Sequence, residues 1–177
     1  MRVAAKALLT VVALLVAVSA NAQPRPGGGK AGGGGPSGPS GGPPAGLVTA
    51  LTLDQMAQLF KAAGFQSEVA DNGGTKMVHT VFWTPDIFGG ALPQVCEKDG
   101  STCHGMKIFA NLGNAGVDQK WLDSWNNSWL YVRASNTNGN LIFSWDIGLF
   151  TGLSPDYLVT AIKLFKQIVD QSTDFKP

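Results

Sequence analysis

The 177-residue sequence has few of the residues on which small catalytic, metal-binding or disulfide-rich proteins depend. It holds 2 cysteines, 2 histidines and only 14% charged residues. Two cysteines exclude a disulfide-dense toxin, and a hydrophobic share of 44% excludes a mostly disordered chain. No apolar run reaches the ~20 residues needed to cross a bilayer. The composition therefore also excludes a polytopic membrane protein.

An excess of positive charge is missing from the part of the chain that can fold. Four of the 13 basic residues precede Leu47, so residues 47–177 carry 9 basic and 12 acidic residues, a net charge of −3. A domain that binds nucleic acid needs a basic face for the phosphate groups. We therefore expect no nucleic-acid partner. The 131 residues of this segment include all 16 aromatic residues and suffice for one ordinary domain.

Catalytic motifs are scarce as well. No H-E-x-x-H appears, and the glycines of residues 23–46 lack the strand and helix context that a phosphate-binding loop needs. His79 lies within a strand pattern, where a half-buried structural histidine is more usual than a catalytic one. Glu97 and Asp99 fall in a loop tip, where we expect them to be solvated. We therefore expect no enzyme, no catalytic residues, no cofactor and no metal.

Residues 1–22 have the three parts of a secretory signal peptide. Arg2 and Lys6 supply positive charge, Ala7–Val18 is apolar with one interruption, and Ala20-Asn21-Ala22 fits the small-x-small cleavage pattern. The apolar stretch is too short to favour a retained membrane anchor. We expect an exported protein, periplasmic or secreted, with no membrane span after cleavage.

Residues 23–46 hold 11 glycines and 6 prolines. Such a stretch offers no apolar groups whose burial could offset the entropy of ordering it. We expect a disordered linker, which is either a solubilising leader or a spacer that lets the domain reach a partner. The folded domain is then expected over residues 47–177.

Capping and turn residues predict the elements of this domain. Thr52 and Gln55 form a capping box that starts a helix ending at Gly64. Asp118 starts a second helix, through about Ser128, and Ser154-Pro155-Asp156 starts a third, to about Ser172. Strand patterns cover residues 65–70, 77–84, 106–112, 130–135 and 141–147, with a long connection over 85–105. The order α-β-β-β-α-β-β-α predicts an α+β fold with a largely antiparallel sheet and the helices packed on one face.

Aromatic and apolar side chains leave two interpretations open. The third helix has an apolar arc of roughly 160°, against the ~100° stripe of a surface helix. Either this helix lies deep across the sheet, or part of the arc forms a dimer or partner surface. Tryptophans recurring at helical spacing are usually core, yet tryptophan is enriched at binding hot spots. Trp129 and Tyr131, at a helix-to-strand corner, are expected to reach solvent. With Leu164 of the third helix, they are our candidate interaction residues.

Cys96 and Cys103 most simply form a disulfide, because they are an even, closely spaced pair in a chain expected to be exported. A redox switch and a metal site that includes His104 are the alternatives, but C-x6-C is not a usual zinc or thioredoxin spacing. Arg133 and Asp146 lie on the two strands of the last hairpin. If they are in register, they form a cross-strand charge pair.

Over its last fifty residues the domain resembles the YbjN-like family, whose members are described as bacterial sensory transduction regulators. The residues that carry the resemblance are Trp125-Asn126, Arg133-Ala134, Asn138-Gly139, Asp146 and Gly152, with a similar helix exit at Ala63-Gly64-Phe65. The resemblance implies the fold of type III secretion chaperones, which are small domains that dimerise and hold partner polypeptides. It implies no catalytic residues.

The expected function is a non-enzymatic protein-interaction or regulatory domain, chaperone-like and dimeric, in envelope or stress-related regulation. Its protein partner is not identified by the sequence, and a homodimer is expected. The alternative is a periplasmic sensor of redox state or of a small ligand, centred on Cys96, Cys103 and His104.

Overall fold

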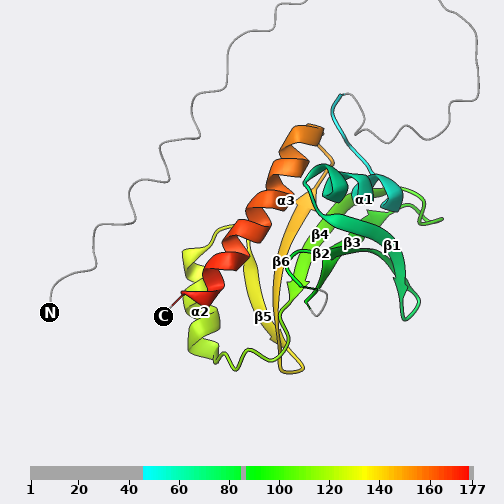
Figure 1. Ribbon diagram of the computed structural model, residues 1–177. Coiled ribbons are helices and arrows are strands. Elements are labelled where there is room, and N and C mark those ends of the chain that lie inside the picture. Colours follow the sequence, from blue (N-terminus) through cyan, green and yellow to red (C-terminus); the bar gives the residue numbers. More distant parts are fainter. Residues whose placement is uncertain (1–45, 85–86, 176–177) are drawn as a thin grey trace, which may run out of the picture. The chain divides into compact units, whose positions relative to one another are not determined.

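The computed structural model describes residues 46–84 and 87–175, which all fall within one compact unit. The expected signal peptide and all but the last residue of the expected linker lie outside the described residues. The described chain forms three α-helices and six strands, with a single turn of 3-10 helix after the last α-helix (Figure 1). The elements are α1 (Leu53–Ala62), β1 (Gln66–Asn72), β2 (Thr75–Val81), β3 (Phe88–Cys96), β4 (Cys103–Asn111), α2 (Gln119–Ser128), β5 (Arg133–Thr137), β6 (Asn140–Gly148), α3 (Pro155–Asp170) and η2 (Gln171–Thr173).

The strands form one antiparallel sheet in the order β1-β2-β3-β4-β6-β5. The predicted α+β class, the antiparallel sheet and the helices packed on one face are confirmed. The predicted helix starts are also confirmed, because Thr52, Asp118 and Ser154 each accept a hydrogen bond from a backbone N–H three residues later. At Thr52 the capping box is complete, since the Gln55 side chain accepts a hydrogen bond from the Thr52 N–H in return.

One strand was not predicted. The expected connection over residues 85–105 contains β3, which pairs with β4 from Phe88↔Asn111 to Cys96↔Cys103. Pro93 is tolerated in this strand because β2 pairs only with Gly89, Gly90 and Ala91, which leaves the rest of β3 without a neighbour on that side.

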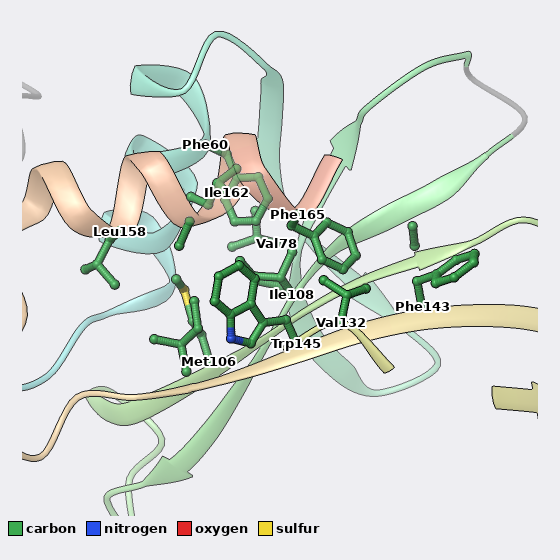
Figure 2. Close-up of a cluster of buried hydrophobic side chains, with 14 of the residues drawn as sticks. Phe60, Val78, Met106, Ile108, Val132, Phe143, Trp145, Leu158, Ile162 and Phe165 are labelled. Carbon is green, nitrogen blue, oxygen red and sulfur yellow. The ribbon is translucent and has the colours of Figure 1, made fainter. Parts of the chain in front are cut away.

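The core lies between the helices and the covered face of the sheet. Figure 2 shows Ile162 and Phe165 of α3 directed toward side chains from the central strands, among them Ile108 and Trp145. Because alternate residues of a strand point to opposite faces, one register row, Val78↔Ala91↔Ile108↔Trp145, supplies the middle of this core. Of the two interpretations of α3, burial across the sheet holds for most of its apolar arc; the buried positions are Leu158, Ala161, Ile162, Phe165, Ile168 and Val169.

The predicted charge pair between Arg133 and Asp146 is wrong. The Asn138-Gly139 turn sets Arg133 opposite Ser144. Asp146 instead lies 3.4 Å from Lys107 Nζ on β4, the strand at its other side. The Arg133 guanidinium donates to the backbone carbonyl of Asn126.

Within the described residues, no helix is long and apolar enough to span a membrane.

Candidate functional site

A short connection joins the end of α2 to the start of β5, and its direction is determined by the backbone conformation of Trp129 at the helix end. Trp129 has an extended backbone (φ −117°, ψ 126°), so the chain leaves the helix there. Its N–H still donates to the Trp125 carbonyl oxygen at 3.0 Å. We call Trp129, Leu130 and Tyr131 the aromatic corner.

Two side chains of α2 hold the chain just beyond this corner. The indole N–H of the fully buried Trp125 donates to the Val132 carbonyl oxygen at 3.0 Å. The Asn126 amide makes two bonds to the backbone of Ala134, since Nδ2 donates to the carbonyl oxygen at 2.9 Å and Oδ1 accepts from the N–H at 2.8 Å. The corner is therefore fixed at its start by the last bond of the helix and at its end by the buried and partly buried bonds of Trp125 and Asn126.

Two apolar side chains of the corner face solvent. Leu130 is 74% exposed and Tyr131 is 55% exposed. The Tyr131 ring stacks on Trp145, with centroids 5.2 Å apart and an angle of 23° between the planes. Because Trp145 is buried in the core, Tyr131 has a rigid support. The corner can thus offer apolar and aromatic contacts in a preset geometry.

The expected exposure of Tyr131 is confirmed. Trp129, which was also expected to reach solvent, is half-buried and therefore only partly exposed. Its ring lies against Trp125, with centroids 5.5 Å apart. The Trp129 Nε1 atom is buried and has no hydrogen-bond partner among the described residues. The other four tryptophans also pack in or against the core, so none of the five is a freely exposed ring.

Leu164 lies on α3 and is 37% exposed. It shares a helix flank with Tyr157, two turns earlier and 48% exposed. Ala161, between them on that flank, is buried. The structure therefore places Leu164 at the rim of the buried arc of α3, on a different element from the aromatic corner.

Cys96 and Cys103 form the predicted disulfide, which joins neighbouring residues of β3 and β4. Cys103 is buried, and its backbone exchanges two hydrogen bonds of 2.9 Å with Leu51. His104 is turned elsewhere: its Nδ1 lies 3.0 Å from the Thr49 carbonyl oxygen, and its ring stacks on the exposed Phe150. The described residues contain no group of three His, Cys, Asp or Glu side chains arranged to hold a metal ion.

His79 lies beside a shallow hollow of about 240 Å³ on β1 and β2. Its Nδ1 atom is 4.0 Å from Glu68 Oε1, and its ring stacks on Phe88 with centroids 5.3 Å apart. The remaining lining residues are Gln66, Ser67 and Val81, which bring no second acid or base beyond Glu68.

The loop between β3 and β4 carries one perturbed acid. The backbone N–H of Ser101 and its hydroxyl donate to Asp99 Oδ1, at 3.0 and 2.8 Å. These bonds favour the charged form and lower the pKa of the Asp99 carboxyl below its ordinary value. Glu97 and Asp99 are exposed, as expected of a solvated loop tip.

Sequence reasoning missed one residue of the aromatic corner and the role of one residue that supports it. Leu130 falls in a predicted strand, where an exposed leucine carries no signal. Asn126 is among the residues that carry the family resemblance, but its spacing from Ala134 gives no indication that a helix side chain pairs with a strand backbone.

No family model matches the chain, and no curated protein sequence matches it. A crystal structure described as "YbjN, a putative transcription regulator from E. coli" has a similar fold, with a TM-score of 0.49 and 13% sequence identity. The similarity covers 72% of this chain and 91% of that chain. This distant likeness concerns the fold alone.

Proposed function

We propose that the domain is a non-enzymatic module that binds and regulates another protein, and that the aromatic corner is its binding surface. The observation that carries this proposal is the contrast in exposure at the corner. Leu130 and Tyr131 are exposed, while Trp125 and Trp145, which position them, are buried. An apolar pair exposed on a rigid support suits a binding hot spot.

The hydrogen bonds of Trp125 and Asn126 support the same proposal. They order the backbone around the corner before any partner arrives. A preordered surface loses less conformational entropy on binding than a mobile one. A partner segment with apolar side chains would cover Leu130 and Tyr131, which is the behaviour of a chaperone-like domain.

The proposed setting is the bacterial envelope, with the protein periplasmic or secreted. This part rests on the signal-like pattern of residues 1–22 and on the glycine- and proline-rich stretch after it. On this proposal the linker lets the domain reach its partner. Tryptic accessibility in intact and osmotically shocked cells tests the location.

Crosslinking in intact cells with the tagged full-length protein tests the binding function. We expect one protein to be recovered reproducibly, and recovery to fall about tenfold or more when Leu130 and Tyr131 are both changed to Ser. Phe150→Ser is the matched control, because Phe150 is 64% exposed but lies on a different loop. Equal recovery from all three proteins, or equal loss in both variants, would contradict the corner as the binding surface.

A redox or ligand sensor at the disulfide is the second candidate. One observation favours it: the bridge ends at the exposed Cys96 on one side and, on the other, at Cys103, whose backbone holds Leu51. Opening the bridge would therefore loosen the first described residues of the domain. Thiol titration with a graded reductant separates the candidates, because a structural bridge resists mild reduction and a sensor opens. A Cys96–Cys103 bridge that opens readily would favour the sensor function over the binding function.

A further inference from the structure

The sheet ends at β1 on one side and at β5 on the other, and the turns determine which backbone groups of these two strands point outward. Gly73 and Gly74 both have positive φ (63° and 86°), so β1 and β2 are joined by a two-residue turn that closes on the pair Asn72↔Thr75. Hydrogen-bonded pairs alternate along an antiparallel ladder. The N–H and C=O groups of Ser67, Val69 and Asp71 therefore point away from the sheet.

The edge at β5 is largely closed. Asn138 and Gly139 form the equivalent turn, with φ of 52° and 84°, so Ala134 and Asn136 point outward. The Asn126 side chain takes both outward groups of Ala134. Only Asn136 is left to pair with an incoming strand.

The edge at β1 has no such cover within the described residues. The Ser67 hydroxyl donates to the Ala57 carbonyl oxygen, and the Asp71 carboxylate accepts from the Gly74 N–H, so both side chains are turned inward. Val69 is 38% exposed and is the one large apolar residue exposed on either edge strand. A bare edge with an apolar centre is a template for another strand.

We propose that a second copy of this chain pairs along β1, antiparallel, with Val69 opposite Val69 of the second copy. In this register Ser67 lies opposite Asp71 of the second copy, and the reverse. All three outward residues of each copy then exchange both backbone hydrogen bonds, about six bonds in total. The two sheets become one continuous sheet of twice the width.

The charges of β1 disfavour two of the alternative registers. Shifting the centre to residue 68 places Glu68 opposite its own copy, and shifting it to residue 71 does the same for Asp71. Like charges directly opposite each other destabilise strand pairing. Centring on Val69 instead places Glu68 opposite Ala70 and forms the most hydrogen bonds.

The apolar contact agrees with this register. Val69 lies opposite Val78, whose side chain is in the core, so both point to the face that the helices cover. The twofold axis of two antiparallel strands is perpendicular to the sheet, which puts the helices of both copies on the same face. The two Val69 side chains then meet at the axis and cover one another.

The pairing gives the assembly two binding surfaces, because each aromatic corner lies beside β5, at the end of the strand order away from the paired β1 strands. The resulting bivalency rests on the proposed function of the corner, whereas the pairing itself does not. A partner with two copies of the recognised segment would bind the pair with much higher avidity than one copy.

Sedimentation equilibrium of the purified full-length protein tests the pairing. A small strand-to-strand interface predicts self-association in the micromolar range. We expect Val69→Pro to abolish it, since proline has no N–H to donate and its ring blocks the incoming strand. The Val69 N–H points outward, so the variant keeps the β1–β2 ladder. Asn136→Pro makes the same change on β5 and should leave the association constant unchanged.

Two charge variants test the register and do not depend on how well a proline folds. Ala70→Lys places a cation opposite Glu68 of the second copy and should tighten association about two- to tenfold, while Ala70→Glu should weaken it by a similar factor. A wild-type protein that stays monomeric at a few hundred micromolar, or equal constants for the Lys and Glu variants, would overturn the proposal. If a monomeric protein still captures its partner through the corner, only the pairing fails.

Discussion

The two halves of the sheet are joined to the central strands β3 and β4 in different ways. On one side the β1–β2 hairpin contacts β3 through three register pairs, Val78↔Ala91, His79↔Gly90 and Thr80↔Gly89. On the other side β6 follows β4 over seven pairs, from Gly105↔Gly148 to Asn111↔Ile142. We call the short β2–β3 pairing the narrow seam and the long β4–β6 pairing the broad seam. In the narrow seam the two backbones must approach each other closely, whereas the broad seam has room for large side chains packed on the sheet.

The residues on each side reflect this difference. At the narrow seam a Cβ on Gly90 would lie 1.8 Å from the Val78 carbonyl oxygen, and a Cβ on Gly89 would lie 2.8 Å from the Phe82 ring. At the broad seam Trp125 packs against Phe143 of β6, with ring centroids 4.9 Å apart. One half of the sheet thus depends on glycines, which have no side chain to separate the strands, and the other half depends on large aromatic side chains.

Gly90→Ala should break the narrow seam and have the largest effect. The added methyl group meets a backbone carbonyl that cannot move without separating β2 from β3, and the backbone at φ 154° disfavours any side chain. We expect a loss of about 4 kcal/mol or more in the free energy of unfolding, measured by urea denaturation.

Gly148→Ala is the matched control for this prediction. The nearest atom to its Cβ is 3.7 Å away, so we expect a change within about 0.5 kcal/mol. Hydrogen exchange should show the Gly90 variant losing protection first in β1 and β2. Equal stability of the two variants would mean that the seam is not as tight as described.

Trp125→Ala should damage the other half by about 3–5 kcal/mol, because it leaves a large cavity and frees the Val132 carbonyl. Exchange protection should fall first in α2, β5 and β6. Trp125→Phe separates the two causes, since it keeps most of the volume and loses the indole N–H. If Phe is as damaging as Ala, the hydrogen bond outweighs the packing.

Asn126→Ala should destabilise the β5 edge. The change leaves both outward backbone groups of Ala134 without their partner, and we expect a loss of about 1–3 kcal/mol in the free energy of unfolding. Asn127→Ala, at the exposed neighbouring position, should change little. If both variants behave alike, the amide clamp does not stabilise the edge.

The smallest expected effect concerns the loop between β3 and β4, which belongs to neither half of the sheet. The lowered pKa of Asp99 means that its charged form is favoured in the folded protein. Its stabilising contribution is present above the ordinary aspartate pKa near 3.9 and is lost as the pH falls through the lower folded value. An NMR titration of the carboxyl carbon that gives an ordinary or raised pKa would show that the Ser101 bonds do not form in solution.

The sequence predicts the elements that local chemistry determines. Thr52, Asp118 and Ser154 start helices through bonds to residues three positions away, and such patterns are visible without the fold. The turns at Gly73-Gly74 and Asn138-Gly139 are equally local. Counting back from Asn138-Gly139 would also have placed Arg133 opposite Ser144 and excluded the pair with Asp146.

Long-range contacts decide what the sequence could not predict. Gly89, Gly90 and Pro93 all disfavour strands by propensity, and only the approach of β2 and its early end explain them in β3. At the aromatic corner, the exposure of Tyr131 is predictable because this residue lies where a predicted helix gives way to a strand. The exposure of Leu130 is not, because it follows from how Trp125 and Asn126 hold the backbone.

The first described residues of the domain, Val48 and Leu51 among them, also constrain the order in which it can fold. Leu51 docks onto Cys103, and Val48 docks onto Leu153, almost at the other end of the domain. Most other strand pairings join consecutive hairpin partners and can form early, since they close short loops. During synthesis from the N-terminus, Val48 therefore stays without its partner until Leu153 has been made. The leading segment of the domain is thus synthesised first, but it completes its pairing only as α3 begins to be made.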